Sequence, residues 1–93
     1  MTTQVRASHI LVKTEDEANR IVKRISDGED FPAVAKRFSS CPSRKNGGDL
    51  GWFAKGQMAL EFEQAAFAAE QDTVIGPVKT QFGFHVIKVT GKK

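Results

Sequence analysis

Two histidines and one cysteine are the side chains of this sequence best suited to chemistry near neutral pH. His9 lies in an apolar stretch near the start, Cys41 near the middle, and His85 in a second apolar stretch near the end. A single histidine among apolar neighbours is more often a hydrogen-bonded core residue than a catalyst. Because each histidine falls in a predicted strand of one small sheet, however, the two side chains could meet.

Three interpretations of this set are open from the residues alone. A thiol beside imidazoles resembles the nucleophile and base of a covalent mechanism. The same three side chains could hold a metal ion, although no H-x₃-H or C-x₂-C spacing supports that. They could also form a hydrogen-bonded cluster with no reactive role. Cys41 is the single cysteine of the chain, so it forms no intrachain disulfide.

The strands that must carry the histidines follow from hydrophobic periodicity. Residues 5–12 predict a central strand, because their apolar run at 10–12 suits burial on both faces. Side chains alternate along a strand, so His9 shares a face with Leu11. Residues 84–90 alternate cleanly and predict a last strand, in which His85 shares a face with Ile87.

Three amphipathic helices are predicted between these strands. The first follows Thr14, which together with Glu17 has the form of a capping box, and it stops at Gly28. The second is capped by Asp30, and the third covers residues 60–69. Apolar side chains recur at helical spacing in each helix: Ala18, Ile21, Val22 and Ile25; Phe31, Val34, Ala35 and Phe38; Phe62, Ala65, Ala66 and Ala69.

Short strands are predicted at residues 50–53 and 76–80, and a turn at 81–83 makes the last two strands a hairpin. Residues 39–48 are turn-rich and hold at most a short helical turn. The element order is therefore β-α-α-turn-β-α-β-β, an α+β fold with a partly antiparallel sheet. With 93 residues, 40% of them apolar, the chain suits a single domain over residues 1–93.

Five blocks of the sequence carry a resemblance to a known family. They are SHILVK at 8–13, FPAVAKRFSSC at 31–41, GGDLGWFAKGQM at 47–58, FEQAAFA at 62–68 and GPVKTQFGFHVIKV at 76–89. In this order and spacing, over essentially the whole chain, they resemble the parvulins, which are peptidyl-prolyl cis/trans isomerases. The resemblance implies a four-stranded antiparallel sheet surrounded by four helices, in the order βαααβαββ.

The resemblance also implies a site, matched residue by residue. Two family histidines, the hydroxyl that bridges them, and a position that is cysteine or aspartate form the implied catalytic set: His9, His85, Thr80 and Cys41. The implied substrate-binding set comprises three walls of a proline-ring pocket, a rim residue and a neighbour of the pocket methionine: Leu50, Met58, Phe62, Phe82 and Gln57. Ala59 flanks the same methionine.

The stretch GGDLGWFAKG at 47–56 would shape one wall of that pocket. Gly47 and Gly48 would let the chain turn tightly into a strand. Gly51 would leave room beside Leu50, and Gly56 would turn the chain again toward the pocket. The aromatic residues of this stretch are expected to pack structurally.

Isomerisation about an X–Pro bond makes and breaks no covalent bond, so the implied reaction needs no nucleophile, metal or cofactor. The site must bind the twisted amide better than either planar form. The family accepts aspartate at the position of Cys41, which favours an electrostatic role beside the substrate carbonyl over covalent catalysis. The alternative function is a non-catalytic, chaperone-like module that binds proline-containing or unfolded segments.

Composition and net charge limit the classes of partner that the chain is expected to bind. The net charge of +3 is a mild excess and does not indicate a dedicated nucleic-acid binder. Five basic residues could gather on helical faces and make weak contact with anionic surfaces: Arg20, Lys23, Arg24, Lys36 and Arg37. The link Lys13-Thr14 leads straight into Glu15-Asp16-Glu17 and is short and acidic, so no phosphate on the substrate is expected to be needed. Without a signal segment in the sequence, we expect a cytoplasmic monomer acting on proline-containing peptides and unfolded protein segments.

Overall fold

A computed structural model of the chain describes residues 2–93 and has an α+β architecture. Its elements are β1 (Gln4–Val12), α1 (Glu15–Ser26), α2 (Phe31–Phe38), the 3₁₀ helix η1 (Pro42–Asn46), β2 (Asp49–Ala54), α3 (Leu60–Ala68), β3 (Val74–Thr80) and β4 (Gly83–Lys92). The predicted order is confirmed. The fourth helix of the expected four is only the five-residue η1, so the sheet is covered by three α-helices.

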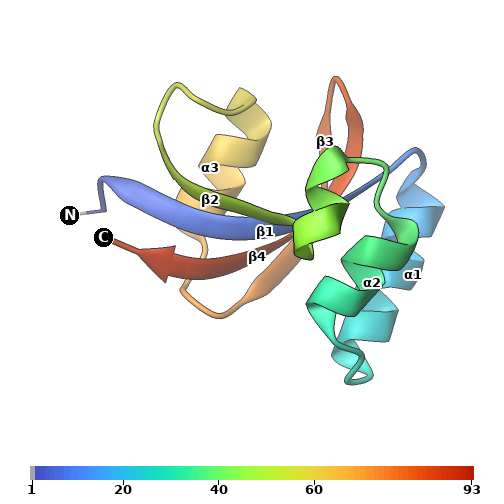
Figure 1. The fold of residues 1–93 in the computed structure, drawn as a ribbon. Coiled ribbons are helices and arrows are strands. Elements are labelled where there is room, and N and C mark those ends of the chain that lie inside the picture. Colours follow the sequence, from blue (N-terminus) through green and yellow to red (C-terminus); the bar gives the residue numbers. More distant parts are fainter. Residues whose placement is uncertain (1) are drawn as a thin grey trace.

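The four strands form one antiparallel sheet in the order β2-β1-β4-β3. The two histidine-bearing strands, β1 and β4, are therefore neighbours at its centre. Figure 1 shows α1 and α2 together at one end of the molecule, while the N and C termini lie close to each other at the opposite end. None of the helices in residues 2–93 combines the length and apolar character needed to cross a membrane.

Two hydrophobic clusters hold the helices to opposite faces of the sheet. One joins α1 and α2 to the β1–β4 centre through Ile10, Val12, Ala18, Ile21, Phe31, Val34, Ala35 and Val86. The other joins α3 to the opposite face through Val5, Ala7, Phe53, Phe62, Ala66, Ile87 and Val89. The alternation of strand side chains explains the division, since neighbours such as Val86 and Ile87 point to different clusters.

The helix starts form as the sequence predicts. The Thr14 hydroxyl accepts a hydrogen bond from the Glu17 amide at 3.2 Å, and the Asp30 carboxylate accepts one from the Ala33 amide at 3.3 Å. These caps satisfy amide groups that have no partner inside their own helix. The two aromatic residues of β2 point to opposite faces of the strand, as side-chain alternation requires. Phe53 is buried, whereas Trp52 is 42% exposed.

Candidate active site

The two histidines meet across the centre of the sheet although 76 positions separate them. Their Nδ1 atoms are 2.9 Å apart, and their rings are nearly parallel, with centroids 5.1 Å apart. Register explains the contact: Leu11 lies opposite His85 on the neighbouring strand, and His9 is two residues before Leu11 on the same face. Both side chains are buried, at 5% and 4% exposure.

Thr80 completes the cluster. Its hydroxyl oxygen lies 2.7 Å from His85 Nε2 and accepts a hydrogen bond from the Phe82 amide at 3.2 Å. With that amide as donor, the hydroxyl proton is free for His85 Nε2. In the tautomer in which Thr80 donates, His85 carries its proton on Nδ1 and donates it to His9 Nδ1, and His9 carries its proton on Nε2. His9 Nε2 is buried without a hydrogen-bond partner in residues 2–93.

Both imidazoles are neutral at physiological pH. Burial, and next the charge that a protonated His85 would carry, lowers the pKa of His9 from 6.5 to about 4. Burial also lowers the pKa of His85 below its usual range. A charged imidazolium is poorly solvated in such an environment, so each ring acts here as a neutral hydrogen-bonding group.

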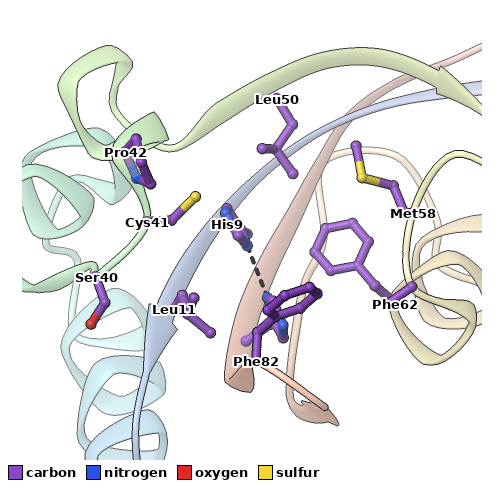
Figure 2. Close-up of a pocket in the computed structure, with 11 residues that line it drawn as sticks. His9, Leu11, Ser40, Cys41, Pro42, Leu50, Met58, Phe62 and Phe82 are labelled. Carbon is purple, nitrogen blue, oxygen red and sulfur yellow. Dashed lines mark hydrogen bonds between the residues drawn. The ribbon is translucent and has the colours of Figure 1, made fainter.

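A pocket of about 350 Å³ opens above the histidines. Figure 2 shows its walls approaching from separate segments, with Cys41 and Pro42 on one side and Met58 and Phe62 on the other. The residues around it are His9, Leu11, Ser40, Cys41, Pro42, Leu50, Met58, Ala59, Phe62, Phe82 and His85. No lysine, arginine, aspartate or glutamate is among them. The pocket is therefore an apolar cleft with a neutral polar base.

Phe62 joins the apolar wall to the histidine base. Its ring presents an edge-on contact to His9 at a centroid distance of 5.6 Å and to His85 at 5.3 Å. It also packs against the buried ring of Phe53 at 5.9 Å. Such edge-to-face contacts favour one relative orientation of the rings. The position of α3 is thereby coupled to the position of the histidines.

Cys41 lies on the opposite wall and is held there by the preceding serine. The buried hydroxyl of Ser39 accepts hydrogen bonds from the Leu11 amide at 3.1 Å and from the Cys41 amide at 3.3 Å. The Ser40 amide donates to the Leu11 carbonyl at 2.8 Å. Half-buried Cys41 has its sulfur directed into the pocket on the side of His9 (Figure 2).

The glycine-rich stretch is needed for two different reasons. Gly48 has a φ of 86°, and its carbonyl accepts a hydrogen bond from the His9 amide at 2.9 Å. A Cβ on Gly48 would collide with the His9 carbonyl oxygen, so close backbone approach requires glycine. A Cβ on Gly51 would meet no atom within 4 Å other than those of its chain neighbours. Glycine is favoured there by a φ of 72°, at which the Asp49 carboxylate accepts a hydrogen bond from the Gly51 amide. The expectation that Gly51 leaves room beside Leu50 stays a prediction.

Most of the sequence-predicted site residues come together. Seven of them line the pocket: His9, Cys41, Leu50, Met58, Phe62, Phe82 and His85. Thr80 lies behind His85 and does not line the pocket. Gln57 is exposed and also lies off the pocket; its side-chain oxygen accepts a hydrogen bond from the Ala54 amide at 2.6 Å. Its contact with substrate stays a prediction.

Leu11, Ser40 and Pro42 line the pocket but were not singled out from the sequence. Leu11 could have been found, because it follows His9 by two residues in a strand. Ser40 and Pro42 flank Cys41, and their place depends on the path of an irregular loop. In residues 2–93, no three His, Cys, Asp or Glu side chains are grouped closely enough to hold a metal ion.

Comparison with known proteins gives consistent similarities. The family model described as Rotamase, PPIC-type PPIase domain, matches residues 5–91. Foldase protein PrsA of Geobacillus kaustophilus is 50% identical over 91 residues, which are 97% of this chain and 32% of that protein. Foldase protein PrsA of Bacillus subtilis is 47% identical over 97% of this chain and 31% of its own length. The chain thus spans about a third of the curated relatives that it matches.

Solved structures agree with these matches. The crystal structure of the peptidylprolyl isomerase PrsA from Bacillus anthracis superposes with a TM-score of 0.97 at 43% identity, covering 99% of this chain and 43% of that chain. The solution structure of the parvulin of Nitrosopumilus maritimus superposes with a TM-score of 0.87 at 40% identity. That match covers 98% of this chain and 99% of the other, so the similarity extends over nearly the full length of both chains.

Proposed function

We propose a mechanism and a substrate class for this chain, which belongs to the PPIC-type peptidyl-prolyl cis/trans isomerase family, the parvulins. It is a peptidyl-prolyl isomerase that assists protein folding by rotating the peptide bond before proline. That rotation is slow because amide resonance must be broken, against a barrier of about 18–20 kcal/mol. A thousandfold acceleration needs about 4 kcal/mol of preferential binding to the twisted amide.

The apolar pocket over two neutral histidines is the observation that carries the proposed mechanism. Leu50, Met58 and Phe62 would hold the proline ring while the residue before proline rotates. The twisted amide has less charge separation than the planar one. Removing water from the site therefore costs the twisted amide less solvation free energy than it costs the planar forms. His9 and His85 would form a rigid neutral base that favours this state without exchanging protons with it.

Cys41 has an electrostatic role beside the substrate carbonyl in this proposal, and no covalent intermediate forms. Nucleophilic attack by a thiol needs a base that accepts its proton. His9 is a poor base for this purpose, because burial lowers its pKa to about 4. Cys41→Ala and Cys41→Asp should both keep isomerase activity. Loss of activity in folded Cys41→Asp, together with an acyl adduct detected by mass spectrometry, would contradict the assignment.

The proposed substrates are unphosphorylated segments with an uncharged residue before proline. No charged side chain lines the pocket. The link between β1 and α1 is only Lys13-Thr14, and the first turn of α1 that follows it carries Glu15, Asp16 and Glu17, all exposed, whose charges would repel a phosphate. A peptide series with leucine, glutamate or phosphoserine before proline tests this. Leucine should give the highest kcat/KM, and a strong preference for phosphoserine would contradict the proposal.

Exchange spectroscopy on a proline-containing peptide tests the function directly. Catalytic amounts of the chain should produce cis–trans exchange cross-peaks, and Met58→Ala should weaken them while the fold persists. A chain that binds the peptide without any exchange would support the alternative, a chaperone-like module that holds unfolded segments.

A cytoplasmic location and a monomeric state remain part of the proposal. The single cysteine, Cys41, suits a reducing compartment. Cell fractionation and light scattering test the two statements separately. Recovery of the protein outside the cytoplasm, or a dimer at micromolar concentration, would contradict them.

A further inference from the structure

The catalytic pocket has more lining than a proline ring can contact. Its volume is about 350 Å³, and the three side chains proposed to hold the ring are a minority of its eleven lining residues. Cavities of this size accommodate ligands far larger than one five-membered ring. Among the other lining residues are Leu11, Ser40 and Phe82, which belong neither to the proline walls nor to the histidine base. We call these three residues the Phe82 subsite, and the size of the pocket indicates that they contact a second part of the substrate.

Three segments that are far apart in the sequence form the Phe82 subsite. The Ser40 amide donates a hydrogen bond to the Leu11 carbonyl at 2.8 Å, which joins the loop after α2 to β1. A Cβ on Gly83, the residue after Phe82, would lie 3.3 Å from a terminal methyl carbon of Leu11, so the turn between β3 and β4 passes beside the same leucine. Figure 2 shows Leu11 and Ser40 on one side of Phe82 and the proline wall Phe62 on the other. The subsite therefore adjoins the walls proposed for the proline ring.

The turn between β3 and β4 holds the backbone of Phe82 at the mouth of the pocket. Thr80 and Gly83 pair across this turn, and the Phe82 amide donates a hydrogen bond to the Thr80 hydroxyl at 3.2 Å. The backbone of Gly83 approaches the Val12 carbonyl oxygen so closely that a Cβ there would collide with it. The Phe82 side chain is nevertheless 65% exposed, although it lines the pocket. A large apolar side chain in this position gains free energy when a ligand covers it.

We propose that the Phe82 subsite binds the side chain of the residue before proline and selects large apolar side chains there. The inference rests on the proposed function, in which the proline ring contacts Met58 and Phe62 and the preceding carbonyl lies beside Cys41. The residue that carries this carbonyl then lies on the Cys41 side of the ring. Proline restricts that residue to extended backbone conformations, so its side chain and the ring occupy different parts of the site. Leu11 and Phe82 contact this side chain.

The Phe82 subsite should select by size among uncharged side chains. Its single polar side chain is that of Ser40, which is exposed, so little in the subsite rewards a polar group. A larger apolar side chain covers more of Phe82 and removes more apolar surface from water. Because the subsite is open to solvent at the exposed Phe82 ring, we expect a total difference of about tenfold in kcat/KM between alanine and leucine before proline, the low end of what hydrophobic pockets achieve.

Exchange spectroscopy with two matched peptide series tests the proposal. The first is Ac-Ala-Xaa-Pro-Ala-Lys-NH₂ with glycine, alanine, leucine or phenylalanine as Xaa, so that size changes while charge stays constant. The kcat/KM should rise from glycine through alanine to leucine and phenylalanine. The second series, Ac-Ala-Ala-Pro-Xaa-Lys-NH₂, varies the residue after proline and should show little dependence on size. Intermolecular NOEs between the methyl groups of the leucine before proline and the Phe82 ring provide a readout that needs no turnover.

Variants assign the size preference to Phe82. Phe82→Ala should reduce the ratio of kcat/KM between the leucine and alanine peptides from about tenfold to about twofold, and Phe82→Leu should restore most of it. Leu60→Ala removes an apolar side chain of similar exposure, 62%, that does not line the pocket, and it should leave the ratio unchanged. An unchanged ratio in folded Phe82→Ala, or a size dependence confined to the residue after proline, would overturn the proposal.

The subsite and the isomerase function can fail separately in these experiments. Exchange at equal kcat/KM for all four peptides of the first series would overturn the subsite and leave the isomerase function standing. NOEs to Phe82 without any exchange would support the subsite and contradict the function. Absence of these NOEs at saturating leucine peptide would overturn the subsite whether or not exchange is seen.

Discussion

Acidification from pH 7.5 to 5 should destabilise the domain by about 2 kcal/mol through His9 alone. Burial lowers the pKa of His9 to about 4 in the folded protein, from 6.5 for an unperturbed imidazole. Below pH 6.5 the unfolded chain binds a proton that the folded chain excludes, so the free energy of unfolding falls as pH falls. The slope approaches about 1.4 kcal/mol per pH unit, and the total loss approaches about 3.4 kcal/mol below pH 4. His85, whose pKa is also lowered, acts in the same direction.

Urea denaturation at pH 7.5, 6.5, 6 and 5 measures this loss. The window ends at pH 5 because carboxylates begin to titrate below it. The His9→Gln variant should lose less stability than the natural chain over the same window, since it removes one of the two titrating groups. An NMR titration of the natural chain provides a second test that does not depend on the variant folding. A free energy of unfolding that stays constant over the window, or a His9 ring that titrates above pH 6, would refute the argument from burial.

Three substitutions, two of them with a comparison variant, test the supports of the pocket. Ser39→Ala leaves two backbone N–H groups without their acceptor and should lower the free energy of unfolding by about 1–3 kcal/mol in urea denaturation. Gly48→Ala should cost at least about 3 kcal/mol, since it combines positive φ with a backbone collision, whereas Gly51→Ala should cost only about 1 kcal/mol for its φ. Met58→Ala should lower kcat/KM about tenfold, roughly 1.4 kcal/mol of transition-state binding, while exposed Leu60→Ala should leave it unchanged.

Local sequence signals predicted the elements of the fold well, because helix caps and hydrophobic periods act over short distances. Thr14 and Asp30 cap the helices that they were expected to cap. Element ends were less predictable: β3 begins at Val74, two residues before the expected start, because pairing with β4 extends the strand beyond its own apolar pattern. The resemblance overstated the helices, since SRKN after Pro42 supports only one 3₁₀ turn.

The residues of the site were predictable from the sequence, but the hydrogen bonds and backbone conformations that hold them in place were not. Periodicity placed His9 and His85 on strands, and the family resemblance then paired them. The role of Ser39 depends on a loop folding back on β1, and no spacing in the sequence indicates that contact. The backbone conformation at Gly51, with a φ of 72°, was not indicated by any spacing in the sequence either.

Substitutions in the base of the pocket should lower both stability and activity, whereas substitutions in its walls should mainly lower activity. The base lies on the two central strands and includes His9 and His85, which are buried and hydrogen-bonded to each other. Damage there leaves unsatisfied polar groups inside the sheet, so it costs folding free energy as well as catalysis. Met58 belongs instead to a turn outside the sheet and is half-buried at the edge of the core under α3, so its loss removes contacts with the substrate and leaves no buried polar group unsatisfied. Selection on substrate preference can therefore act through the walls while the histidine base stays fixed by the demands of folding.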